Sequence, residues 1–200
     1  MRPEIPIMKH LKQHTLFIII LMLASTLAKA QIDTGRITGH PRLLLLKGEE
    51  SRIIDEIKKD TTWNKVHQSI IDESEEILSL PQVERTLIGR RLLQVSRESL
   101  RRIFFLSYAW RLTHKKKFFD RCEEELLTAS KFQDWNPSHF LDVAEMTMAV
   151  AIGYDWLYND LSARSREVIS KAIIEKGLAP SQGANIFLVC AGTVISKPII

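Results

Sequence analysis

The chain has 200 residues, 45% of them hydrophobic and 26% charged, which suits one soluble domain with its own core or part of a larger one. Its formal net charge is +4, but residues 1–30 hold four bases and one acid, which leaves 24 bases and 23 acids in the rest. This balance excludes a nucleic-acid partner recognised by net charge. The two cysteines are too few for a disulfide framework, and no metal-ligand spacing predicts a cofactor.

Residues 1–30 have the pattern of a secretory signal peptide. Basic residues open the chain, residues 16–23 form an uninterrupted apolar run, and Ala28 and Ala30 supply the small residues that a signal peptidase recognises. The apolar run is shorter than the ~20 residues needed to span a bilayer. We therefore predict cleavage before Gln31, export to the periplasm or beyond, and no stable membrane anchor afterwards. An uncleaved N-terminal anchor is the alternative interpretation.

Two helices are predicted between residues 50 and 80. Isoleucines recur at the helical period in the first, from Ile53 to Ile57, and apolar residues recur in the same way from Val66 onward. Asp60 interrupts the pattern and is the predicted N-cap of the second helix, and Pro81 is its predicted end.

Four more helices are predicted further along the chain. Ser162 is the predicted cap of the last helix and Gly177 its C-terminal stop. No segment alternates polar and apolar residues with a period of two, so the predicted class is all-α. The expected ranges are 83–112, 118–132, 137–158 and 163–176.

An internal repeat indicates how these helices are arranged. Tyr108 and Trp110 match Tyr154 and Trp156 at a shift of 46 residues, and in each copy an apolar helix, a polar turn and a charged helix follow one another. Repeats of this length predict stacked helical hairpins, with an inner apolar and an outer charged helix in each. The hairpins would form either a curved solenoid or an incomplete (α/α) toroid.

The predicted inner helix 137–158 has polar residues near its start. Asn136 precedes Pro137 as a cap, and His139, Asp142 and Glu145 follow at i, i+3 and i+6 on one flank. Acids in the first turns interact favourably with the helix dipole. These residues could line a ligand cleft, or they could form a structural network in which His139 binds Asp142.

A second set of polar residues lies on one face of the predicted helix 83–112. Arg90, Arg97 and Arg101, together with Gln94, form a row that suits carboxylate or sulfate groups on a polymer. The alternative is a solvated face on which Arg97 or Arg101 pairs with the neighbouring Glu98. Tyr154 and Trp156 are expected in the core, and Gly153 is expected where two helices pack closely.

Several stretches resemble a known family. They are "HPRLLL" from His40, "SRESLRRIFFLSYAWRL" from Ser96, "DWNPSHFLDVAEMTMAVAIGYDWLY" from Asp134, and "KGLAPS" from Lys176. Together they are similar to the N-terminal toroid of heparinase II/III-like polysaccharide lyases. The resemblance covers about residues 39–181 and implies export, an acidic polysaccharide partner of glycosaminoglycan or alginate type, and β-elimination at a uronate by a Tyr or His base and acid.

The resemblance ends before the family's catalytic segment. The residues after Ser181 match neither the expected helix nor its Asn-Trp-Asn type motif, so no catalytic residue is assigned. Residues 182–200 have the composition of an out-of-frame tail, and residues 31–181 are the predicted partial toroid. Two hypotheses follow: the N-terminal fragment of a secreted lyase, itself inactive, or a non-catalytic helical module that binds glycans or acts as a scaffold. The expected cleft residues are Asn136, His139, Asp142, Glu145, Arg97 and Arg101.

Overall fold

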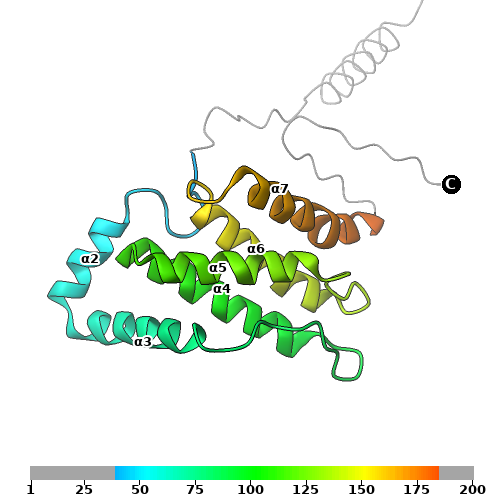
Figure 1. Cartoon of the computed structure of the whole chain (residues 1–200), viewed down its shortest axis with the longest axis horizontal. Helices are drawn as coiled ribbons and strands as arrows, with labels where there is room; N and C mark the ends of the chain where they lie inside the picture. The colour runs from blue at the N-terminus through cyan, green and yellow to red at the C-terminus, as the bar shows by residue number, and fades with distance from the viewer. Residues whose placement is uncertain (1–38, 185–200) are drawn as a thin grey trace, which may run out of the picture. The chain divides into compact units, whose positions relative to one another are not determined.

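The computed structural model describes residues 39–184, and all regular elements in this range are helical (Figure 1). No β-strand occurs among these residues, apart from one isolated bridge between Ile88 and Arg91. The all-α prediction is therefore confirmed. The α-helices of this range are α2 (Glu50–Lys59), α3 (Thr61–Ile77), α4 (Leu93–Thr113), α5 (Lys116–Lys131), α6 (Phe140–Leu157) and α7 (Ala163–Ala172).

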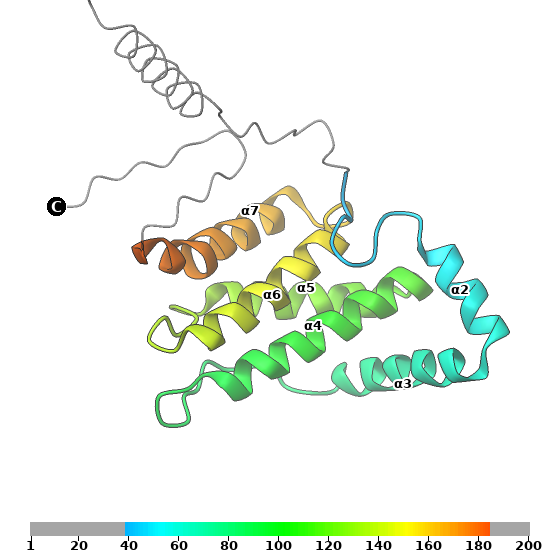
Figure 2. The same cartoon turned by 180° about the vertical axis from the view of Figure 1, so that it is seen from behind.

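The helices from α3 onward form two layers. α4 and α6 lie side by side in one layer and run in the same direction, while α3, α5 and α7 lie in the other (Figures 1 and 2). From α4 onward, each helix runs antiparallel to the one before it (Figures 1 and 2). Short connections favour antiparallel neighbours, and the connection between α4 and α5 is the turn at His114, whose φ of 52° is left-handed.

The core lies between the two layers. Ile103 of α4, Leu126 of α5 and Met146 of α6 are each 0% exposed. Gly153 of α6 faces the first two, because a Cβ atom there would lie 2.5 Å from Ile103 Cγ2 and 2.8 Å from Leu126 Cδ2. The prediction that Gly153 marks a close helix contact is therefore confirmed, and any larger residue would displace the side chains of Ile103 and Leu126.

Two of the predicted N-caps are present. The carboxylate of Asp60 accepts a hydrogen bond from Thr62 N–H at 2.6 Å at the start of α3. The hydroxyl of Ser162 accepts one from Ser165 N–H at 3.0 Å at the start of α7. Both side chains satisfy a backbone donor that has no partner within its helix.

The predicted start of the long helix at Val83 is wrong. α4 begins at Leu93, because the chain makes a tight turn in which Ile88 N–H donates to Arg91 O at 2.9 Å. Gly89 occupies this turn with φ +62°, a backbone conformation that glycine adopts without strain. The preceding helix also ends earlier than predicted, at Ile77 and not at Pro81.

The predicted start of α6 is also wrong. Asn136 has a left-handed φ of 60°, and its backbone N–H donates to Asp134 Oδ1 at 2.7 Å. The helix begins at Phe140 with His139 as its N-cap, so Asn136 does not cap it and Pro137 is not in its first turn.

The last helix ends differently from the prediction as well. α7 stops at Ala172 and continues as a π-helical segment, Ile173–Leu178, and a 3-10 helix, Ala179–Ala184. Gly177 therefore lies inside the π segment, where a Cβ atom would lie 2.6 Å from Thr147 Oγ1. It allows a close contact and is not a helix stop.

In the part of the chain that the structure describes, no helix combines the length and the apolar character that crossing a bilayer requires. The predicted signal peptide, residues 1–30, lies outside the described residues. So does the predicted tail, apart from residues 182–184.

Candidate functional site

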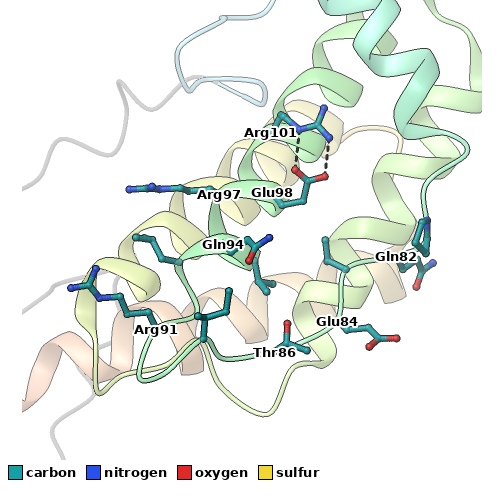
Figure 3. A pocket seen from close by; sticks show the side chains of 13 residues that line it. Gln82, Glu84, Thr86, Arg91, Gln94, Arg97, Glu98 and Arg101 are labelled. Carbon is teal, nitrogen blue, oxygen red and sulfur yellow. Dashed lines mark hydrogen bonds and ion pairs between the residues drawn. The ribbon is translucent and has the colours of Figure 1, made fainter.

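A groove of about 820 Å³ lies between α4 and the segment that precedes it, residues 81–92. The buried side chains of Val83 and Leu92 fix this segment to the domain, while the turn at Ile88 is exposed. Figure 3 shows the side chains that line the groove. Its polar and charged lining residues are Gln82, Glu84, Thr86, Arg91, Gln94, Arg97, Glu98 and Arg101.

The helical period explains which residues of α4 face the groove. Gln94, Arg97 and Arg101 lie three or four residues apart, so they share one face of the helix. The opposite face carries Ser99, Ile103 and other residues that pack inside the domain. The predicted polar row is thus present on α4, except for its first member, Arg90, which lies in the turn before the helix.

Arg101 is occupied by partners within the protein. Its guanidinium contacts both carboxylate oxygens of Glu98, at 3.0 and 2.8 Å, and it also binds Glu73 of α3. Hydrogen bonds from Arg101 and Arg102 lower the pKa of Glu98 to about 2, although burial opposes this shift. The alternative prediction, an Arg101–Glu98 pair, is therefore confirmed, and this guanidinium is not free for a ligand.

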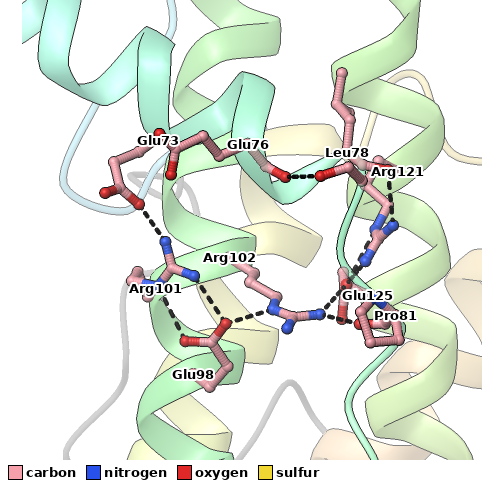
Figure 4. A network of polar contacts seen from close by, with 10 residues as sticks. Glu73, Glu76, Leu78, Pro81, Glu98, Arg101, Arg102, Arg121 and Glu125 are labelled. Carbon is pink, nitrogen blue, oxygen red and sulfur yellow. Dashed lines mark hydrogen bonds and ion pairs between the residues drawn. The ribbon is translucent and has the colours of Figure 1, made fainter.

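A cluster of ion pairs continues from Glu98 into the interior (Figure 4). The guanidinium of Arg102 donates to Glu98 at 2.6 Å and to the fully buried Glu125 of α5 at 3.0 Å. Arg121 donates to the same oxygen of Glu125 at 2.6 Å and to Leu78 O at 3.3 Å. The cluster joins α3, α4 and α5, and the ion pairs offset part of the cost of burying these charges.

Arg91 and Arg97 remain as the available cations of the groove. Their side chains extend on the same side of α4, whereas the Gln94 amide, which also lines the groove, points the other way (Figure 3). Arg91 has no ion pair with any of the described residues, and Arg97, whose side chain is 64% exposed, lies 3.4 Å from Glu145 Oε1. We call Arg91, Gln94 and Arg97 the basic rim.

Next to the groove, the start of α6 holds a buried carboxylate. Asp142 is 0% exposed, and its Oδ2 accepts hydrogen bonds from Leu92 N–H and from the Asn136 side-chain amide, each at 2.7 Å. The amide of Asn136 also donates to Arg90 O at 2.8 Å. Burial alone would raise the pKa of Asp142, but these hydrogen bonds outweigh it, so the pKa lies below its ordinary value.

His139 and Glu145 complete the predicted polar flank. His139 Nδ1 lies 3.1 Å from Asp142 Oδ1, a close contact whose direction does not fit a hydrogen bond. Glu145 Oε2 accepts a hydrogen bond from the buried Ser96 hydroxyl at 2.7 Å. Glu145 therefore connects α6 to α4, while the contact of His139 lies within the start of α6 itself.

A second buried carboxylate lies near the other end of α6. Asp155 accepts hydrogen bonds from Arg42 N–H and Leu43 N–H, both at 2.8 Å, and lies 2.5 Å from His40 Nδ1. The His40 ring stacks on Tyr158 with centroids 3.8 Å apart. The sequence analysis did not single out Asp155. Its only sequence signal is an acid inside an otherwise apolar helix, which indicates a partner but does not identify one.

Comparison with models of known protein families gives no match, and comparison with curated proteins gives no significant match.

The six predicted cleft residues fall into two groups. Arg97 and Arg101 line the groove. Asn136, His139, Asp142 and Glu145 are not among its lining residues, and they form contacts at the start of α6. Their contact with a ligand stays a prediction. Arg91, which the analysis of the sequence did not select, joins the first group because the chain turns back at Gly89.

Proposed function

We propose that this chain supplies the first helical hairpins of an (α/α) toroid in an exported polysaccharide lyase, and that the groove binds a uronate-containing acidic polysaccharide. The basic rim carries this proposal, because the guanidinium groups of Arg91 and Arg97 extend on the same side of α4 and the Gln94 amide lines the same groove. The antiparallel helices in two layers also support it, since such hairpins are the units of a toroid.

The chemistry of the rim suits the proposed ligand. Guanidinium groups bind carboxylate and sulfate oxygens through paired hydrogen bonds. Glu84 also lines the groove, and Figure 3 shows it across from Arg91 and Arg97, so an anionic chain would lie along the rim and away from this carboxylate. Glu98 repels an anion less, because Arg101 and Arg102 already neutralise it.

β-Elimination at a uronate needs a base for the C5 proton and an acid for the leaving oxygen. Among the residues that line the groove there is no tyrosine or histidine. In the proposed enzyme the groove therefore binds and orients the polysaccharide, and the proton-transfer residues come from other helices. The chain by itself would bind substrate without cleaving it.

The same composition of the groove lining, without tyrosine or histidine, also favours a second function. In this function the chain is a non-catalytic glycan-binding module. The groove offers charge and hydrogen-bond donors but no proton-transfer group.

Binding is tested by chromatography of the full chain on heparin, alginate and neutral dextran resins. We expect retention on heparin or alginate, elution by salt, and no retention on dextran. Arg91→Gln should weaken retention by about threefold in affinity, the effect of losing one exposed ion pair. Lys58→Gln on α2, which removes an exposed charge far from the groove, should have no effect. Absence of retention on both acidic resins would overturn both functions.

The coding DNA that follows the codon for Ser181 distinguishes the lyase hypothesis from the binding-module hypothesis. Under the lyase proposal, one of its three reading frames continues with further toroid helices, and the joined product releases unsaturated uronate from the polysaccharide that the chain binds. A joined product without this activity, or no such frame, would favour the binding module.

A further inference from the structure

The segment that carries Arg91 belongs to neither a helix nor a strand. Residues 81–92 connect α3 to α4, and their exposed turn has large apolar side chains, Leu87 and Ile88, which are 45% and 67% exposed. Apolar burial therefore holds this segment at Val83 and at Leu92 but not at the turn between them. The position of Arg91, at the edge of the exposed turn, also depends on polar contacts.

These contacts come from the loop before α6 and from the first turn of α6, and they lie at both ends of the turn. The buried amide of Asn136 donates to Arg90 O at 2.8 Å, directly before Arg91 in the chain. Asp142 accepts Leu92 N–H at 2.7 Å, directly after it. On the other side of the turn, the guanidinium of Arg85 donates to Asp134 O at 3.1 Å.

Asn136 joins these contacts into one network. It donates to Arg90 O and to Asp142 Oδ2, and its own side-chain oxygen accepts from the Ser138 hydroxyl at 2.8 Å. Its left-handed backbone conformation, φ 60°, is one that asparagine adopts more readily than most residues. Only a side chain that donates two hydrogen bonds from this backbone position makes the same network.

We propose that Asn136 is a positioning residue for ligand binding, which acts by holding Arg91 at the rim of the groove. The inference rests on the proposed function, since it assigns the loop before α6 a role in binding the same acidic polysaccharide. A fixed guanidinium loses less conformational freedom when the ligand binds, so it contributes more to affinity than a mobile one.

The test is a double-mutant cycle between Asn136→Gly and Arg91→Gln in the full chain. Glycine keeps the left-handed backbone and removes both donors. Heparin affinity is measured over a range of salt concentrations, because each lost cation contact reduces the slope of log affinity against log salt by about one. We expect each single variant to bind heparin about threefold more weakly and to show the same reduction in the salt slope. The double variant should bind no more weakly than Arg91→Gln alone.

A merely structural role for Asn136 has a different signature. It would lower the melting temperature, leave the salt slope of the folded protein unchanged, and weaken binding equally in both backgrounds. Ser130→Ala is the matched control, because it removes a buried hydroxyl that bonds within α5 and lies outside the groove. It should change neither affinity nor slope. Arg85→Met, which frees the other end of the segment, should act in the same direction as Asn136→Gly if that variant does not fold.

The outcomes separate the inference from the proposed function. If the unmodified chain does not bind heparin or alginate, the proposed function fails and the inference fails with it. If the unmodified chain binds and Arg91→Gln weakens binding, but Asn136→Gly has no effect or an additive one, only the inference is overturned.

Discussion

The two ends of α6 use the same chemistry for different purposes. At the start, Asp142 accepts the backbone N–H of Leu92, and near the end Asp155 accepts those of Arg42 and Leu43. Each carboxylate is buried and lies within 3.1 Å of a histidine nitrogen. Buried carboxylates can therefore attach distant chain segments to one helix, as long as each has enough donors.

The difference lies in the segments that they hold. Asp155 holds the segment from His40 to Leu46, whose carbonyls also accept hydrogen bonds from Trp156 and Arg111. Asp142 holds the segment that carries Arg91 on the groove. Removing the carboxylate of Asp155 should affect stability alone. Removing the carboxylate of Asp142 should affect both stability and ligand binding.

The largest effect is expected for Asp155→Ala. It leaves two backbone donors without a partner and separates His40 from α6, so the free energy of unfolding should fall by about 3 kcal/mol. Urea denaturation measures the loss. Heparin affinity per folded molecule should not change, and a change would show that the comparison between the two ends is wrong.

Asp142→Ala should destabilise the domain by about 2 kcal/mol, since Leu92 N–H and one amide donor of Asn136 lose their acceptor. Unlike the variant at Asp155, it should also weaken heparin binding, because the Arg91 segment loses a contact. Equal heparin affinities for Asp142→Ala and Asp155→Ala would contradict the proposed difference between the two ends of α6.

A pH titration of stability should single out Asp142. Its pKa in the folded state lies below the ordinary value of 3.8, so its charged form contributes stability that is full above about pH 4. The contribution is lost as the pH falls through the folded-state pKa. The difference in unfolding free energy between the unmodified chain and Asp142→Asn should therefore shrink below pH 4. A difference that stays constant or grows there would contradict this assignment.

The smallest effect on stability is expected for Arg97→Gln. Arg97 is mostly exposed and lies 3.4 Å from Glu145, so the unfolding free energy should change by no more than about 0.5 kcal/mol. Heparin affinity should fall by about threefold, as for Arg91. A variant that loses stability but keeps its affinity would place the ligand away from the basic rim.

Local signals in the sequence were enough to predict several contacts. Asp60 and Ser162 cap their helices, and Arg101 pairs with Glu98 three residues away, because groups one turn apart on a helix must be neighbours. Gly153 was correctly assigned to a close helix contact. The two caps and the Arg101–Glu98 pair need no knowledge of how the helices pack.

Contacts between distant segments could not be predicted in this way. Asp155 and His40 are 115 residues apart, and Arg102 meets Glu125 across 23 residues, so spacing alone gives no reason to pair them. The boundary errors have the same origin. The helical period continues through Gly89 in the sequence, but the actual chain turns there and is held by Asn136 and Asp142.

The sequence by itself determined the helical class, most of the helices and the polar face of α4, because all of these depend on residues within a few turns of one another. Only the tertiary structure decided which charges are free. Packing of α3 and α5 against α4 pairs Arg101 with Glu73 and Arg102 with Glu125, and the turn at Gly89 brings Arg91 beside Arg97. Electrostatic pairing depends on distance in space, and that distance is set by the packing of the helices.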